Sequence, residues 1–136
     1  MTTRIAMREA VVKRLFDAMA RGFADALPID RYADRVVGWS PRRSHCHEQV
    51  VLWLLLHPTD QAVRGWLLEY HAGHEVRFAA HSLVRTAGGL LIDVAFPTPE
   101  FARPFIEHPL AAGDFFALVF GEPPMPTIDV PDPHWS

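Results

Sequence analysis

The sequence has 136 residues, of which 49% are hydrophobic, and its 13 basic and 16 acidic side chains give a formal net charge of -3. A chain of this size can bury one core, so we expect a single domain over residues 1–136. The charge lacks the basic excess of a nucleic-acid-binding protein, and no apolar run approaches the roughly 20 residues that cross a bilayer. The single cysteine, with no signal-peptide pattern before it, favours a reducing cytoplasm.

The first half of the chain is predicted to be mainly helical. Apolar residues at helical spacing predict an amphipathic helix from Thr2 to about Leu27. A loop broken by proline and glycine follows, with at most a short helix or strand around Tyr32 to Val37. Ser44 is the expected N-cap of a short, almost wholly buried helix from His45 to Leu56, which ends before Pro58.

The second half is predicted to be mainly strands. Three short segments, rich in aliphatic and aromatic residues and separated by glycine-containing turns, predict an antiparallel meander over residues 62–70, 75–85 and 90–96. A short helix is expected near Glu100 to Ile106, and a further strand or buried edge over Asp114 to Phe120. The proline-rich tail from Gly121 is expected to be extended and to lie on the domain surface.

The only cysteine, Cys46, lies at the start of the second predicted helix. The positive end of the helix dipole and the unpaired backbone N–H groups of the first turn favour a thiolate over a thiol. This position is therefore typical of a nucleophile. A small buried hydrophobe is the competing interpretation for a lone cysteine.

A hairpin in the predicted meander brings two further polar side chains together. A three-residue loop ending at a left-handed Gly88 pairs Arg85 with Gly89, and His81 then lies opposite Asp93 on the same face. A two-residue turn would place them on opposite faces. Asp93 lies in an apolar strand, where a carboxylate needs a partner. The competing interpretation of Asp93 is a structural hydrogen bond to loop backbone, and that of His81 is an ordinary half-buried histidine of a strand.

The order of these residues resembles a known family. A helix-borne Cys46, the strand "AVRGW", His81 in "HSLV" and Asp93 in "GLLIDVAF" are similar to the core of transglutaminase-like proteins and the wider papain-like group, which includes arylamine N-acetyltransferases. The resemblance covers about residues 44–96. It implies an α+β fold in which the nucleophile helix packs on an antiparallel sheet, with Cys46 as nucleophile, His81 as general base and Asp93 as its orienter.

The expected chemistry is acyl transfer through a thioester, without a cofactor. Substrates would be small-molecule, peptide or protein amides or esters, and the acyl group would pass to water or to an amine. The backbone N–H of Cys46 would hold the oxyanion, with the Trp39 indole as a candidate second donor. His47 is either a second polar group of the site or a solvated residue at the helix start.

Two other classes of function stay open. Histidines around Cys46 permit a zinc site, although the spacing of "HCH" and "HAGH" argues against one, and we expect no metal. A non-catalytic binding module on the same fold is the third class, with Trp66 and Trp135 either forming a contact surface or packing into the core. Formation of a homodimer is also left open.

Overall fold

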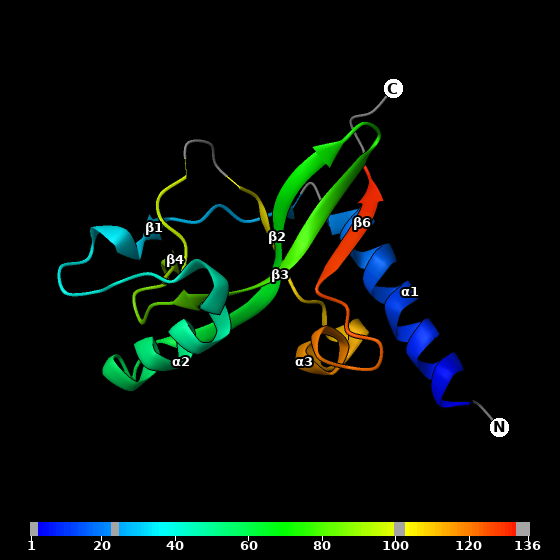
Figure 1. The fold of residues 1–136 in the computed structure, drawn as a ribbon, viewed down its shortest axis with the longest axis horizontal. Coiled ribbons are helices and arrows are strands. Elements are labelled where there is room, and N and C mark those ends of the chain that lie inside the picture. Colours follow the sequence, from blue (N-terminus) through cyan, green and yellow to red (C-terminus); the bar gives the residue numbers. More distant parts are fainter. Residues whose placement is uncertain (1–2, 23–24, 100–102, 133–136) are drawn as a thin grey trace.

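A mixed β-sheet with helices packed against it forms the body of the structure, a computed structural model (Figure 1). The structure describes residues 3–22, 25–99 and 103–132. Over those residues the helices are α1 (Arg4–Gly22), α2 (Cys46–Leu56) and α3 (Phe115–Val119), with short 3-10 helices at Ala33–Arg35, Arg43–His45 and Leu110–Ala112. The strands are β1 (Arg31–Tyr32), β2 (Gln61–Ala72), β3 (Glu75–Arg85), β4 (Leu91–Asp93), β5 (Phe105–Glu107) and β6 (Thr127–Pro131). The expected α+β class is confirmed.

The long hairpin of β2 and β3 is the centre of the sheet, whose strand order is β1-β4-β3-β2-β5. β1 pairs with β4 in parallel, whereas β2 pairs in antiparallel fashion with β3 and β5. The turn between β2 and β3 contains Gly73, whose φ of 64° is a conformation that glycine adopts without a steric penalty. The expected antiparallel strands are present, and the parallel β1 makes the sheet mixed.

The edge of β3 that faces away from β2 is shared by two strands. β6 pairs with Glu75–Ala79 and β4 pairs with Val84–Arg85, both in antiparallel fashion. Residues 81–83 of β3 lie between these two partners. The start of α2 comes against this stretch, since His47 of α2 is hydrogen-bonded to Ser82 of β3. The interruption of the edge thus lets a helix terminus reach the middle of the sheet.

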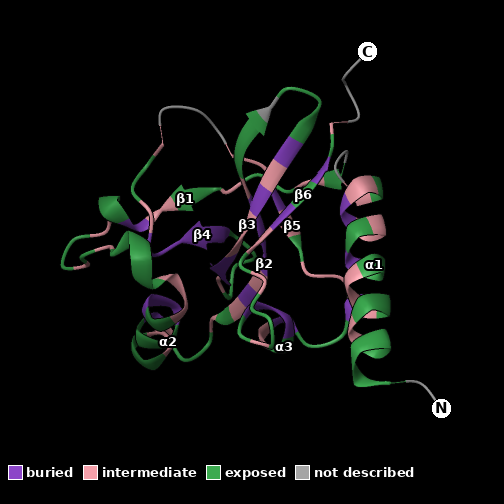
Figure 2. Cartoon of the chain, turned by 45° about the vertical axis from the view of Figure 1, so that its right-hand side comes forward, coloured by how far each residue is buried: buried purple, intermediate pink, exposed green. Residues whose placement is uncertain are grey.

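The core consists of groups of buried apolar side chains that pack along this hairpin (Figure 2). One group joins α1, α3 and β6 to the hairpin, and it includes Leu15, Met19, Trp66, Phe78, Phe115, Leu118, Ile128 and Val130. A second joins α2 to β3 and β4, and it includes Val50, Trp53, Val84, Ile92 and Val94. Burial of these side chains holds α2, and with it Cys46, against the sheet.

Several expected elements differ in extent or burial. α1 ends at Gly22 rather than near Leu27, and the N-cap of α2 is His45, not Ser44. α2 is not almost wholly buried, because one side of it is open to solvent. The apolar side chains on that side are half to three-quarters exposed: Val51 51%, Leu52 50%, Leu55 74% and Leu56 68%.

The C-terminal third contains the larger corrections. Residues 105–107 form strand β5, so the expected helix does not extend there, and residues 100–102 lie outside the described residues. Residues 115–119 form helix α3 rather than a strand, because the Asp114 side chain caps it by accepting from the Ala117 N–H at 2.9 Å. The extended tail is confirmed, but as strand β6 with Ile128 and Val130 buried.

The tryptophans proposed as a contact surface have separate outcomes. Trp66 is fully buried, and its indole N–H donates to Nδ1 of His108 at 3.1 Å, so it belongs to the core and cannot contact a partner. Trp135 lies outside the described residues. Among the helices of the described ranges, none combines the length and the apolar character needed to cross a membrane.

Candidate active site

Cys46 is the first residue of α2 and follows directly on the 3-10 helix Arg43–His45. The N-cap residue His45 makes no side-chain cap hydrogen bond to the first turn. The thiol is therefore close to backbone N–H groups that have no side-chain acceptor at the N-cap. Cys46 is partly buried, and its sulfur lies 3.7 Å from Nδ1 of the neighbouring His47.

His81 and Asp93 form a buried pair, as expected. The Nε2–H of His81 donates to Oδ2 of Asp93 at 2.7 Å, with both side chains at most 2% exposed. The other carboxylate oxygen, Oδ1, accepts from the backbone N–H groups of Ala95 and Phe96, each at 2.9 Å. The Phe96 ring packs against the imidazole with centroids 4.4 Å apart. Asp93 thus occupies Nε2 and leaves Nδ1 of His81 available.

The register that creates this pair differs from the expected one. β3 and β4 pair Arg85 with Leu91, so the loop has five residues rather than three, and the left-handed glycine is Gly89 (φ 92°), not Gly88. Continuing this register places His81 diagonal to Asp93 instead of directly opposite. Because the register differs by two residues, the alternation of side chains is preserved and both still point to the same face.

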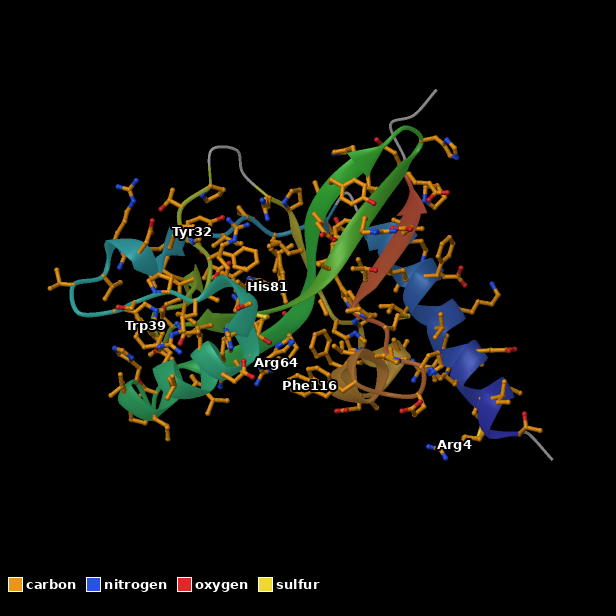
Figure 3. The ribbon with its side chains drawn as sticks, viewed as in Figure 1. Arg4, Tyr32, Trp39, Arg64, His81 and Phe116 are labelled. Atoms are coloured by element: carbon orange, nitrogen blue, oxygen red, sulfur yellow. The ribbon has the colours of Figure 1, made fainter. Side chains whose placement is uncertain are left out.

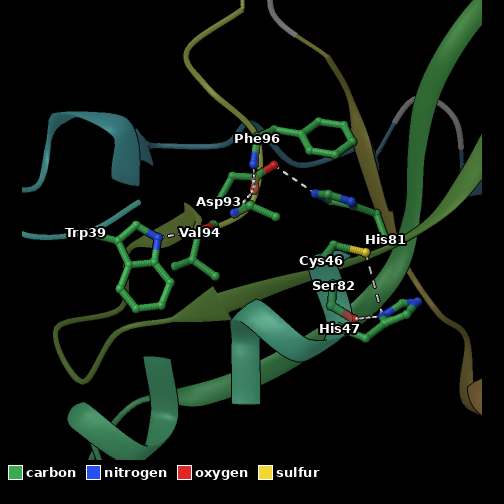
Figure 4. Close-up of polar contacts among 9 residues, drawn as sticks. Trp39, Cys46, His47, His81, Ser82, Asp93, Val94 and Phe96 are labelled. Carbon is green, nitrogen blue, oxygen red and sulfur yellow. Dashed lines mark hydrogen bonds and ion pairs between the residues drawn. The ribbon is translucent and has the colours of Figure 1, made fainter. Parts of the chain in front are cut away.

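Figure 4 shows the Cys46 sulfur beside the His81 ring, which is bonded to Asp93 on its far side. The structure therefore brings the three expected residues together. The thiol is hydrogen-bonded to Nδ1 of His47 at 3.7 Å, and His81 is a second neighbour whose charge acts on the thiol. His47 is partly buried and contacts both the thiol and Ser82, which is the arrangement expected of a second polar group rather than of a solvated residue.

Opposite shifts in pKa follow from this arrangement. Burial disfavours the Cys46 thiolate, but hydrogen bonds and charge interactions with His47 and His81 outweigh it and lower the pKa of the thiol to about 6. Burial likewise opposes protonation of His81, yet the hydrogen bonds to Asp93 and Cys46 raise its pKa to about 9. Between these values the site holds a thiolate and an imidazolium, the reactive form of a cysteine nucleophile.

Trp39, the candidate second oxyanion donor, is used elsewhere. Its indole N–H donates to the carbonyl oxygen of Val94 at 2.8 Å. Its ring packs edge-on against Trp53 with centroids 5.1 Å apart, within the group of buried side chains around α2. Trp39 therefore holds the loop before α2 against Val94, the residue that follows β4, and its N–H is not available to an oxyanion.

Sequence reasoning missed two polar residues of the site, Arg64 and Ser82. The Ser82 hydroxyl is bonded to Nδ1 of His47 at 2.5 Å and accepts from Nη1 of Arg64 at 2.7 Å. Arg64 and Ser82 are direct partners in the β2–β3 register. The "HAGH" turn alone could not have revealed this, because the β2–β3 register shifts by one residue between Leu68 and Tyr70, and the turn without that shift would pair Arg64 with Leu83.

The histidines considered as zinc ligands are spread over several separate contacts. Nδ1 of His45 contacts the Ser44 hydroxyl at 2.9 Å, and Nδ1 of His71 lies 3.4 Å from the Asp132 carboxylate. Within the described ranges, no three His, Cys, Asp or Glu side chains form a group that could hold a metal ion.

Comparisons with known proteins add no relatives: no family model matches the chain, and neither a curated protein nor a solved structure is significantly similar to it.

Proposed function

We propose that this protein is a cysteine-dependent acyl-transfer enzyme on a papain-like or transglutaminase-like core, with Cys46 as the nucleophile. The observation that carries the proposal is the buried His81–Asp93 pair, bonded at 2.7 Å, next to a thiol at a helix start. A buried histidine–carboxylate pair alone has structural explanations. Its placement beside the only cysteine, with a thiol pKa lowered to about 6, favours catalysis.

In the first half of the proposed reaction, the Cys46 thiolate attacks the carbonyl carbon of an amide or ester. The C–S bond forms, the carbonyl electron pair moves onto oxygen, and the Cys46 backbone N–H would donate to that oxyanion. When the carbonyl reforms, the bond to the leaving nitrogen or oxygen breaks. The leaving group takes the proton from Nδ1 of His81, and a thioester remains.

In the second half, His81 acts as a base. Its Nδ1 takes a proton from water or an amine, which attacks the thioester carbon, and the thiolate departs with the electron pair of the C–S bond. Asp93 keeps the second proton of the ring on Nε2 throughout, because it accepts that N–H. Transfer to water yields an acid and transfer to an amine yields an amide.

A non-catalytic binding module is the second candidate, and one observation favours it. The exposed apolar side of α2, with Leu55 at 74% and Leu56 at 68% exposure, has the character of a contact surface. A binding module does not require an ionised thiol, so thiol reactivity separates the two candidates.

The test is the pH dependence of alkylation by iodoacetamide, followed by the mass of the protein, which has a single cysteine. In the wild type the rate should rise with a midpoint near pH 6, where the Cys46 thiol ionises. In His81→Ala the midpoint should move upward, toward the roughly 8.5 of a free thiol, because the stabilising cation is gone. A wild-type midpoint at pH 8 or above, or an unchanged midpoint in the variant, would favour the binding module.

A further inference from the structure

Arg64 of β2 is a half-buried cation without an acidic partner among the described residues. Its Nη1 donates to the Ser82 hydroxyl at 2.7 Å, and its guanidinium carbon lies 4.8 Å from the centre of the Phe116 ring. One neutral hydroxyl and one ring face satisfy only part of a group with five N–H donors. A cation removed from water to this extent is stabilised by an anion, and the described protein supplies no carboxylate for it.

Arg64 is connected to the reactive thiol through two side chains. The sulfur of Cys46 lies 3.7 Å from Nδ1 of His47, the same nitrogen lies 2.5 Å from the Ser82 hydroxyl, and that hydroxyl accepts from Arg64. Figure 3 shows Arg64 and Phe116 side by side where β2 passes between α2 and α3. The Cys46 thiolate and the Arg64 guanidinium interact electrostatically. Burial lowers the pKa of the guanidinium, and the negative charge of Cys46 opposes that shift.

An aromatic wall borders the same place. The ring of His47 contacts the rings of Phe116 and Phe120 at centroid distances of 5.2 and 5.7 Å. Phe120 is 66% exposed, so this wall opens to solvent. The side of the thiol away from Asp93 therefore combines a cation with apolar ring surface, of which the Phe120 ring is exposed to solvent.

The charges of the site change during the proposed reaction, and Arg64 is affected. In the resting state the thiolate, the imidazolium and the Asp93 carboxylate sum to one negative charge, and the thiolate is the negative group that acts on Arg64. In the thioester, Cys46 is neutral and His81 has given up its proton; the sum is still one negative charge, but it now lies on Asp93 beyond His81, and the negative group next to Arg64 has disappeared. An acyl group that brings its own negative charge would restore a partner at the step where the protein loses one.

We propose that Arg64 is the anion-binding residue of this site and that the acyl group of the substrate carries a carboxylate. This inference rests on the proposed function and adds a substrate class to it. The planar guanidinium suits a carboxylate because it can donate two parallel N–H bonds. The aromatic wall of Phe116 and Phe120 would contact the apolar part of the same acyl group.

Two alkylating agents of similar size test this without knowledge of the substrate. Iodoacetate carries a carboxylate and iodoacetamide does not; with both, the thiolate forms an S–C bond and iodide leaves. The ratio of the two rates on one protein cancels the fraction of thiolate, so it reports the anion preference of the site alone. Relative to the same chain unfolded in urea, the wild-type ratio should favour iodoacetate by about tenfold.

Arg64→Met keeps an aliphatic stem against Phe116 and removes the charge, so the ratio should fall by about tenfold. Arg64→Lys, which keeps the charge, should retain part of the preference. Arg21→Met removes the same charge from the exposed last turn of α1 and should leave the ratio unchanged. An unchanged ratio in Arg64→Met, or equal losses with both reagents, would overturn the inference.

The protein with His81→Ala provides a second measurement should Arg64→Met fail to fold. With the imidazolium gone, a preference for iodoacetate that is the same at pH 7 and pH 8.5 belongs to Arg64, because a guanidinium keeps its charge over this range, and loss of all preference would contradict the inference. Both rates are measured at pH 8.5 as well as at pH 7, so that a thiol with an ordinary pKa still gives a ratio. Slow reaction with iodoacetamide at pH 7 counts against the proposed function, whereas the ratio tests Arg64.

Discussion

At the scale of single residues, the site depends most on Asp93, which makes three hydrogen bonds with its two oxygens. Oδ1 accepts from the N–H groups of Ala95 and Phe96, and Oδ2 accepts from Nε2 of His81. The two backbone donors hold the carboxylate in one orientation. The carboxylate in turn determines which nitrogen of His81 carries the proton that it accepts and which nitrogen faces the thiol.

Asp93→Asn should move the proton of a neutral His81 ring from Nε2 to Nδ1. The backbone N–H groups of Ala95 and Phe96 need an acceptor, so the amide oxygen takes the place of Oδ1 and the amide NH2 faces His81. Nε2 must then accept, a neutral ring carries its proton on Nδ1, and the imidazolium is no longer stabilised. We expect alkylation by iodoacetamide at pH 7 to slow by about tenfold, as the thiol pKa moves toward that of a free cysteine.

A matched control for this substitution is Asp34→Asn. Asp34 is exposed and also accepts from a backbone N–H, that of Thr98, at 3.0 Å, but it has no contact with His81. Its replacement should leave the alkylation rate unchanged. Equal rates in wild type and Asp93→Asn would mean that the carboxylate does not control the state of His81.

At the scale of elements, local sequence patterns predict the helices and strands well, whereas contacts between residues far apart in the sequence could not be predicted. The apolar spacing of α1 and the alternation of β2 and β3 are properties of neighbouring residues, and the sequence predicts all three elements. The run Phe115–Val119 is as compatible with a buried strand as with a helix. Here the side-chain cap by Asp114 and the packing of Phe115 and Leu118 against α1 and β6 decide for the helix.

The candidate site was predictable to the same extent. Cys46, His81 and Asp93 follow from a helix start and from the parity of one hairpin, which survived an error of two residues in the loop. The position of Trp39 depends on Val94, 55 residues away in sequence, and no local signal announces that hydrogen bond. The aromatic contacts of Arg64 also depend on α3, which was not predicted as a helix.

The close approach of β2 and β5 gives a prediction at this scale. Gly65 has no room for a side chain, because a Cβ there would lie 2.4 Å from the Ile106 carbonyl oxygen and 2.5 Å from the Phe105 ring. Gly65→Ala should push β5 away and destabilise the fold by about 1 to 3 kcal/mol. Urea unfolding followed by circular dichroism measures this.

Gly88→Ala is the control for this experiment, since its Cβ would meet nothing closer than 3.8 Å. It should change the unfolding free energy by less than about 0.5 kcal/mol. A Gly65→Ala variant as stable as this control would show that β5 adjusts without cost.

At the scale of the whole molecule, the proposed site lies where separately packed parts of the chain meet. Cys46 belongs to α2, His81 to β3 and Asp93 to the end of β4, while Arg64 comes from β2. The aromatic wall is contributed by α3 and by Phe120, the residue that follows it. Global unfolding separates these groups, so the ionisation of the thiol and the stability of the fold are thermodynamically linked.

The sign of that linkage differs for the two groups. The pKa of His81 is raised from 6.5 to about 9, so its stabilising contribution is full below pH 6.5 and is lost as the pH rises through 9. The pKa of Cys46 is lowered from 9.0 to about 6, so its contribution is full above pH 9 and is lost as the pH falls through 6. The folded pair thus loses protons near 6 and 9, the unfolded pair near 6.5 and 9, and the two trends nearly cancel.

Removing the thiol should make the pH dependence of the His81 contribution to stability measurable. In Cys46→Ala only His81 remains, still hydrogen-bonded to Asp93, so the unfolding free energy should decline between pH 6.5 and 9 more steeply than in the wild type. The stability difference, wild type minus variant, should grow by about 1 to 3 kcal/mol over that range, since one pKa unit corresponds to about 1.4 kcal/mol. Urea unfolding at pH 6, 7.5 and 9 under reducing conditions measures the difference. Groups elsewhere titrate equally in both proteins and therefore cancel in the difference between the two unfolding free energies. A difference that stays constant with pH would mean that folding does not promote ionisation of Cys46.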